Sequence, residues 1–223
     1  MQLSWTQAYH GASPLAAEPV VVGQLRATPA ECQQAASAAV ALQRHYPHWL
    51  GAEPDPSPAG AMLQESALPA VAPGEPGLAG LERLARQAVR WALAALNEVR
   101  GYLHEAGAAA GEEGVQLWVG FHDPQLSQSA LQLALQTALR SVQADFSPAM
   151  AEPALQALWQ QCRQRHPDYQ AHILMSAARH RGVPVLPFDA ALRLWQFGWG
   201  QRSRVFFESN SNHTGPSADP CSG

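Results

Sequence analysis

The chain has 223 residues, of which 47% are hydrophobic and 14% are charged, and its formal net charge is −4. This length allows one large domain or two small ones, and the low charge excludes a dense nucleic-acid-binding surface. All fourteen basic residues are arginines, so chemistry that requires a lysine is excluded.

Cysteine usage and the amino terminus predict a cytoplasmic protein. Cys32, Cys162 and Cys221 are odd in number and far apart, so neither a disulfide framework nor a CxxC site is expected. The first residues, MQLSWTQAYHG, lack the basic and apolar regions of a secretory signal. Because no apolar run approaches the roughly 20 residues of a membrane span, we expect no membrane partner.

The first predicted elements are a strand, a helix and a long loop. Residues 20–25 form a short apolar strand. Thr28 and Pro29 are typical of a helix start, with threonine as the cap and proline in the first turn, and the helix continues through Ala41 or beyond. Residues 47–77 are rich in proline, glycine and alanine, which predicts a long loop.

A long helix is predicted over residues 79–106, with Glu82 and Arg86 as a surface pair. Its apolar positions recur every three or four residues: Leu81, Leu84, Ala88, Ala92, Ala95, Val99 and Leu103. Residues 107–114 break the helix, and residues 115–121 alternate as a strand does. Asp123 and Pro124 then cap a second amphipathic helix. Its predicted stripe is Leu131, Leu135, Ala138, Leu139 and Val142.

These elements predict an α+β fold in which a two-layer sandwich of a small sheet with amphipathic helices occupies residues 1–146. Pro148 and Pro153 mark the boundary before a second segment, residues 147–207, predicted as helix-helix-strand-turn-strand. Its first helix carries Leu155, Leu158, Trp159 and Cys162. Residues 208–223 are expected to be a disordered or truncated tail.

The second helix of this segment has an apolar stripe and ends at Gly182, where a left-handed residue would close it. The stripe is Ile173, Leu174, Ala177 and Ala178. Residues 183–186 follow as a strand, Gly198 and Gly200 permit a tight bend around Trp199, and residues 203–207 form another strand. Trp195, Phe197 and Trp199 either join the core or cover another domain or subunit.

Two stretches of this segment, AARHRGVPV at residues 177–185 and LWQFGWG at residues 194–200, carry a family resemblance. Their order and spacing resemble the run-up to the ATP-grasp domain of cyanophycin synthetases and related amino-acid ligases. The resemblance covers residues 170–214, and Thr214 lies where the family has a threonine just before ATP-grasp begins. Residues 215–223 resemble nothing in the family. The helix RQAVRWALAALN at residues 86–97 lacks the polar groups of the corresponding family helix.

The resemblance implies a role for the chain within a larger bacterial enzyme of amino-acid polymer biosynthesis. In the intact ligase, ATP and Mg²⁺ would activate a carboxylate for joining to an amine, and ATP-grasp enzymes use lysines beside the nucleotide. This chain would be a non-catalytic amino-terminal scaffold without a cofactor of its own and with a surface for substrate or polymer. Its expected partner is the missing ATP-grasp domain or another subunit. The alternative is a stand-alone binding or interaction protein that kept the fold without the ligase domain.

The candidate contact residues are Arg202, Arg204, Trp195 and Trp199. Residues 151–207 hold seven arginines and three acidic residues, whereas residues 1–150 hold seven arginines and thirteen acidic residues. A positive patch suits an anionic ligand or an acidic domain, and a solvated face is the alternative.

We expect Arg202 and Arg204 to share one strand face and contact a carboxylate, or else to form a salt bridge that fixes the turn. The resemblance places a family arginine near Arg204. Arg163 and Arg165 are expected to be solvated.

Catalytic and metal sites are not predicted. His122 is interpreted as a loop histidine after a strand, beside the helix cap Asp123. His45 and His48 could share a face, but Pro47 disfavours a helix between them and no third metal ligand lies near.

Overall fold

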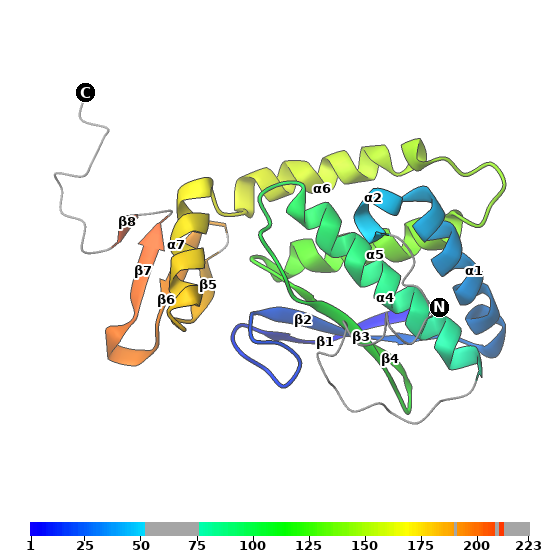
Figure 1. The fold of residues 1–223 in the computed structure, drawn as a ribbon, viewed down its shortest axis with the longest axis horizontal. Helices are drawn as coiled ribbons and strands as arrows, with labels where there is room; N and C mark the ends of the chain where they lie inside the picture. Colours follow the sequence, from blue (N-terminus) through cyan, green and yellow to red (C-terminus); the bar gives the residue numbers. More distant parts are fainter. Residues whose placement is uncertain (52–75, 190, 208–209, 212–223) are drawn as a thin grey trace.

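The computed structural model describes residues 1–51, 76–189, 191–207 and 210–211. A four-stranded antiparallel sheet is covered on one face by helices (Figure 1), which confirms the α+β class and the sandwich of sheet and helices. The strands, in spatial order, are β1 (Gln2–Tyr9), β2 (Val20–Arg26), β4 (Gly114–Gly120) and β3 (Ala106–Gly111). The main covering helices are α1 (Pro29–His45), α4 (Pro76–Asn97) and α5 (Pro124–Arg140).

Alternation along β2 and β4 divides the apolar side chains between the two faces of this sheet. Val21 and Leu25 pack with the helices in a large hydrophobic cluster. Val20, Val22 and Trp118 pack together on the opposite face, which the helices do not cover. Successive side chains of a strand point to opposite faces, so an apolar run such as VVV fills both.

The predicted helix starts are confirmed by their caps. Thr28 accepts a hydrogen bond from the backbone N–H of Glu31, whose carboxylate accepts one from the Thr28 N–H at 2.8 Å. Asp123 Oδ1 accepts from the N–H of Gln125 at 2.9 Å at the start of α5. The predicted pair of Glu82 and Arg86 is also present, at 2.6 Å.

The prediction of a helix over residues 79–106 is wrong at its carboxyl end, because α4 ends at Asn97. The predicted break at residues 107–114 is wrong too, because residues 106–111 are β3 and pair with β4. Residues 106–111 read AGAAAG and carry no β-forming pattern. This strand exists because β4 offers a partner and because the Trp118 ring lies against Gly107, where a Cβ would collide with it.

Three other local predictions need correction. Strand β1 was not predicted, and it pairs with β2 with a register shift between Trp5 and Gln7. Residues 47–50, assigned to the loop, form the short helix α2 (Pro47–Leu50). Leu139 and Val142 are exposed rather than part of the buried stripe of α5. Most of the predicted loop, residues 52–75, lies outside the described residues.

Helix α6 (Glu152–Arg165), preceded by the short helix η1 (Pro148–Met150), packs on the large cluster. The buried residues of α6 are Leu155, Leu158 and Cys162, three of the four apolar residues that the sequence analysis assigns to this helix. The division into residues 1–146 and 147–207 stays a prediction. The large cluster ends in α6, and a separate hydrophobic cluster begins in α7 (Tyr169–His180), so the boundary between the clusters lies after residue 162 rather than at residue 147.

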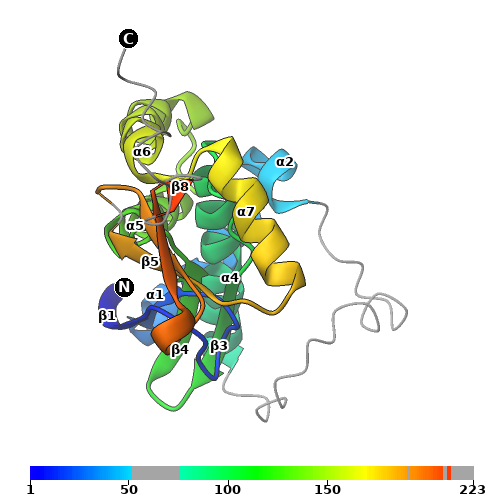
Figure 2. The same ribbon diagram turned by 90° about the vertical axis from the view of Figure 1, so that its left-hand side faces the viewer.

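A second antiparallel sheet, packed against α7, follows (Figure 2). Its strands, in spatial order, are β5 (Val185–Asp189), β6 (Leu194–Phe197), β7 (Arg204–Phe207) and β8 (Asn210–Ser211). Ala171, Met175, Trp195 and Phe197 form the small cluster between helix and sheet.

Several sequence predictions for this segment differ from the structure in detail. The first strand begins at Val185 rather than Val183, and β6 is an additional strand. Ile173 is exposed, because α7 buries Ala171 and Met175 instead. Within the predicted tail, Asn210 and Ser211 pair with β7. The remaining tail residues 208–209 and 212–223, with Thr214 and Cys221, lie outside the described residues.

The predicted tight bend is confirmed. Gly198 has φ 79° and Gly200 has φ 58°, a conformation that glycine adopts without strain. Gly182 closes α7 with φ 65°, also as predicted. After the bend, residues 200–202 form the short helix η2 (Gly200–Arg202), and the strand predicted over residues 203–207 is confirmed as β7.

Candidate functional site at the joint between the two clusters

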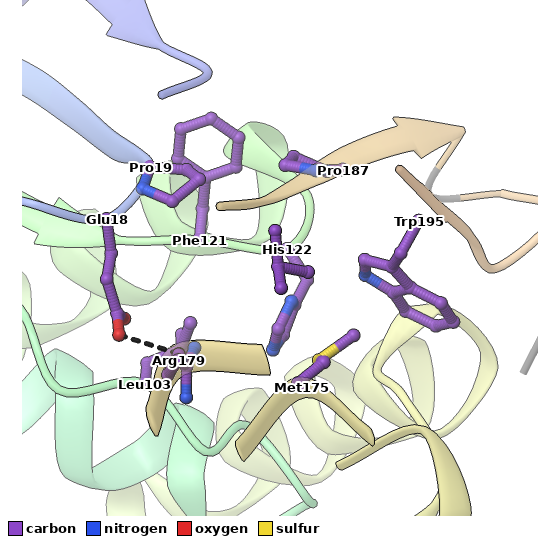
Figure 3. Close-up of a pocket in the computed structure, with 10 residues that line it drawn as sticks. Glu18, Pro19, Leu103, Phe121, His122, Met175, Arg179, Pro187 and Trp195 are labelled. Carbon is purple, nitrogen blue, oxygen red and sulfur yellow. Dashed lines mark ion pairs between the residues drawn. The ribbon is translucent and has the colours of Figure 1, made fainter. Parts of the chain in front are cut away.

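The residues around His122 join the large cluster to the small one, and we call this region the joint. His122 follows β4 at the edge of the large cluster and is only 6% exposed. Its ring lies 6.2 Å from the ring of Trp195 in the small cluster, and 5.6 Å from that of His166, which follows α6. Figure 3 shows His122 between Phe121 on one side and Met175 and Trp195 on the other.

A tight connection after α4 positions the hydrogen-bond acceptors of the joint. The Asn97 side chain donates to the carbonyl of Leu103 and accepts from its N–H, both at 2.9 Å. Between them, Arg100 and Tyr102 have φ 53° and 51°, a left-handed conformation that is uncommon outside glycine. The Gly101 carbonyl accepts a hydrogen bond from His122 Nε2 at 2.6 Å. The turn therefore orients the histidine ring.

His166 is held from the same turn by a second hydrogen bond. Its Nδ1 donates to the Val99 carbonyl at 2.7 Å. Burial, together with the neighbouring His166, lowers the pKa of His122 to about 3. Burial also lowers the pKa of His166 to about 4. Both rings are therefore neutral near pH 7 and act as hydrogen-bond donors in the joint.

An ion pair between Asp123 and Arg165 ties α5 to the end of α6. The Asp123 side chain is 7% exposed, and its Oδ2 accepts from Arg165 Nη1 while its Oδ1 caps α5. Arg165 is therefore not the solvated residue that the sequence analysis expects. Arg163 is exposed, as expected.

The outer side of the joint is polar. Glu18, in the β1–β2 loop, pairs with Arg179 of α7 at 2.8 Å (Figure 3). Burial raises the pKa of Glu18, against the lowering effect of Arg179. The His172 ring stacks on Tyr102 with 3.6 Å between centroids, and its pKa is lowered by burial and then by Arg179. These contacts connect α7 to two loops of the first sheet.

A small cavity of about 20 Å³ lies in the joint, lined by residues that include Glu18, His122, Arg179 and Trp195. This volume accommodates about one water molecule and is far smaller than a typical ligand pocket of ~300–1,000 Å³. Of its polar lining side chains, Glu18 and Arg179 pair with each other and His122 donates to the Gly101 carbonyl. Chemically, the arrangement fixes the small cluster on the large one.

The structure separates the four candidate contact residues. Trp195 is 1% exposed and lies in the joint, whereas Trp199 is 59% exposed. Arg202 ends η2 and Arg204 begins β7, so the expected pair on one strand is wrong. Arg204 Nη1 donates to the Ser203 carbonyl at 2.8 Å, and none of its bonds within the described residues goes to a carboxylate. Whether these residues contact another domain stays a prediction.

The joint was missed in the sequence analysis because its members lie far apart along the chain. The interpretation of His122 as a loop histidine is correct in position, but its ring is buried. No local motif links residues 18, 101, 122, 166 and 179. The one available signal was the chain's nine histidines, of which His122, His166 and His172 converge here.

Other features weighed in the sequence analysis behave as ordinary parts of the fold. His45 packs edge-on against Phe146, with 4.9 Å between ring centroids. Within the described ranges, no group of three or more His, Cys, Asp or Glu side chains could hold a metal ion. Cys32 and Cys162 are buried free thiols, and burial raises the pKa of Cys162 to about 12. In the same ranges, no helix has the length and apolarity needed to cross a membrane.

A scan against protein-family models finds no match to this chain, and a search of curated proteins finds none either.

We expect acid to weaken the joint. The pKa values of His122 and His166 in the folded state lie below the ordinary value of 6.5. The unfolded chain therefore takes up protons first as pH falls. Stability should be full above about pH 7, and each of the two histidines should lower the free energy of unfolding by roughly 2–3 kcal/mol at pH 4.5. Urea denaturation at several pH values measures it.

The variant His122→Gln separates this effect from general acid destabilisation. Glutamine can still donate to the Gly101 carbonyl but has no proton to gain in this range. Its unfolding free energy should depend less steeply on pH than that of the wild type. Equal slopes for the two proteins would remove the assigned role of His122.

The Arg165–Asp123 pair gives a second prediction. Arg165→Ala leaves a buried carboxylate without its partner, so we expect a loss of about 2–3 kcal/mol of stability. Arg204→Ala removes only exposed contacts to backbone carbonyls and should cost under about 1 kcal/mol. Thermal melting of both variants, with Arg163→Ala as an exposed control, makes the comparison. A larger effect at Arg204 than at Arg165 would contradict this ranking.

Proposed function

We propose that this chain is the non-catalytic amino-terminal portion of a cyanophycin-synthetase-like ATP-dependent carboxylate–amine ligase, in which it serves as a scaffold. The resemblance of residues 170–214 suggests the enzyme class. The closed joint supports the scaffold role: the contact of His122 with Trp195, the stacking of His172 on Tyr102 and the ion pair of Glu18 with Arg179 fasten the small cluster and second sheet to the large cluster. A segment that positions a following catalytic domain needs such a rigid base.

The second sheet also has an apolar surface suited to a neighbouring domain. Trp195 and Phe197 point towards α7 in the small cluster. On the other face of the sheet, Leu194 lies opposite Phe207 in the strand register. Apolar residues of this sheet and its turns are 49% to 61% exposed: Phe188, Leu192, Trp199 and Phe207. Exposed large apolar side chains favour association with another protein surface.

The continuation of the gene tests the proposal most directly. Sequencing of the genomic region after codon 223 should show an ATP-grasp reading frame fused to or adjoining this one. A stop codon followed by unrelated genes would count against the ligase and favour the stand-alone alternative.

The isolated chain should neither hydrolyse ATP nor bind Mg-ATP tightly. It has no lysine to place beside nucleotide phosphates, and among the described residues no group of three or more His, Cys, Asp or Glu side chains could hold Mg²⁺. We expect isothermal titration calorimetry to detect no binding at micromolar concentrations. Low-micromolar affinity would contradict a non-catalytic role.

The second candidate function is a stand-alone binding or interaction protein. One observation favours it: a groove of about 640 Å³ on the helical layer, within the range of ligand sites. Binding there would not require a ligase domain. An anchoring surface for substrate or amino-acid polymer, as part of the ligase proposal, would also have to be an open site of this kind.

A further inference from the structure

An open groove lies at the end of the molecule away from the second sheet. It runs between α1 and the segment that follows α5, with a contribution from α4, and its volume is about 640 Å³. In Figure 1, α1 lies on the right and the second sheet on the left, so the groove is separate from the joint. Its principal side chains are Val40, Arg44, His45, Arg83, Val142 and Phe146.

The charge of the groove has one sign. Arg44, His45 and Arg83 line it, and no Asp or Glu is among the lining residues that the structure describes. Arg44 is exposed and, among the described residues, forms no ion pair or hydrogen bond. The positive charge of Arg44 in the groove attracts an anion.

The remainder of the lining is apolar and accessible. Val40 is 38% exposed and Val142 is 48% exposed. Phe146 presents its ring beside His45. These side chains provide an apolar floor next to the arginines, so the groove complements a molecule with an apolar body and an anionic end.

We propose that this groove binds an amphipathic organic carboxylate, with the carboxylate at Arg44 and the apolar body over Val40, Val142 and Phe146. A guanidinium group matches the two oxygens of a carboxylate, and the flanking valines add contact area that a bare anion cannot use. The inference rests on the groove alone and does not depend on the ligase proposal.

The test uses octanoate as the probe and the full chain labelled at its valine methyl groups. Two reference compounds separate the contributions of charge and of the alkyl chain to binding. Acetate has the carboxylate without the long alkyl chain, and octylammonium has the alkyl chain with the opposite charge. Methyl NMR titration should show octanoate shifting the Val40 and Val142 signals, with weaker binding of both reference compounds.

Arg44→Gln and Arg140→Gln form a matched pair of variants. Each arginine is exposed in the last turn of its helix, where it complements the helix dipole, but only Arg44 lines the groove. We expect Arg44→Gln to weaken octanoate binding about fivefold or more. Arg140→Gln should leave it unchanged.

Three outcomes would overturn the proposal. They are no shift of the groove methyl groups at millimolar octanoate, octylammonium binding as tightly as octanoate, and equal effects of the two variants. Because the ligase proposal is tested by the gene continuation, either proposal can fail without the other.

Discussion

Gly101→Ala should destabilise the protein by about 2–4 kcal/mol. A Cβ atom at this position would lie 2.6 Å from the Leu96 carbonyl oxygen and 2.6 Å from Asn97 Oδ1. The backbone oxygen belongs to the last turn of α4 and cannot move away without disrupting that helix. The side chain of Asn97 cannot move without losing both of its hydrogen bonds to Leu103. Urea denaturation measures the loss.

Gly182→Ala is the matched control for this substitution. Gly182 has φ 65°, so alanine there is strained, but a Cβ would meet no atom within 4 Å. Its expected cost is about 1–2 kcal/mol, from backbone conformation alone. If the two alanine variants lose the same stability, the close packing around Gly101 has no special importance.

Trp195→Ala should have the other large effect, a loss of about 3–5 kcal/mol. Trp195 is 1% exposed, belongs to the small cluster and contacts His122 across the joint. Its removal should weaken both the small cluster and the contact between the two clusters. Chemical denaturation gives the stability, and limited proteolysis near residues 166–169 reports whether α7 has loosened from α6.

Trp199→Ala provides the comparison at an exposed position of the same turn region. Because the Trp199 side chain is 59% exposed, its loss should cost under about 1 kcal/mol in the isolated chain. Comparable losses for the two tryptophans would contradict the burial described here. In a longer protein that includes a following domain, an increased cost at Trp199 would support its role as a contact.

The helix starts of this fold could be predicted because their signals are local. The side chains of Thr28 and Asp123 accept hydrogen bonds from backbone N–H groups two or three residues later. The residues next to each cap are therefore sufficient to predict where the helix begins. Gly182 closes α7 for a similarly local reason. The end of α4 has no such signal, since Val99 and Leu103 continue its apolar spacing. There, Asn97 closes a turn whose carbonyl groups accept hydrogen bonds from His122 and His166, which are distant in sequence.

Strand β3 and the joint could not be predicted from local pattern, whereas β1 carries a local strand signal, the alternation of Leu3 and Trp5 with polar residues. Strand β3 consists of alanine and glycine and depends on β4 and on the Trp118 ring. The joint needs contacts between residues more than 60 positions apart, such as His166 with Val99. The candidate site residues were incomplete for the same reason. Trp195 is predicted from the pattern of residues 147–207, whereas its contact partner His122 lies in residues 1–146.

The division between the two hydrophobic clusters has a consequence for the order of events during synthesis. All strands of the first sheet and its covering helices, through α6, are complete by residue 165. The large cluster can therefore form on the ribosome before α7 and the second sheet have emerged. The carboxy-terminal segment then meets a finished surface with His122 and His166 already in place, so its folding is a docking step guided by the earlier part of the chain.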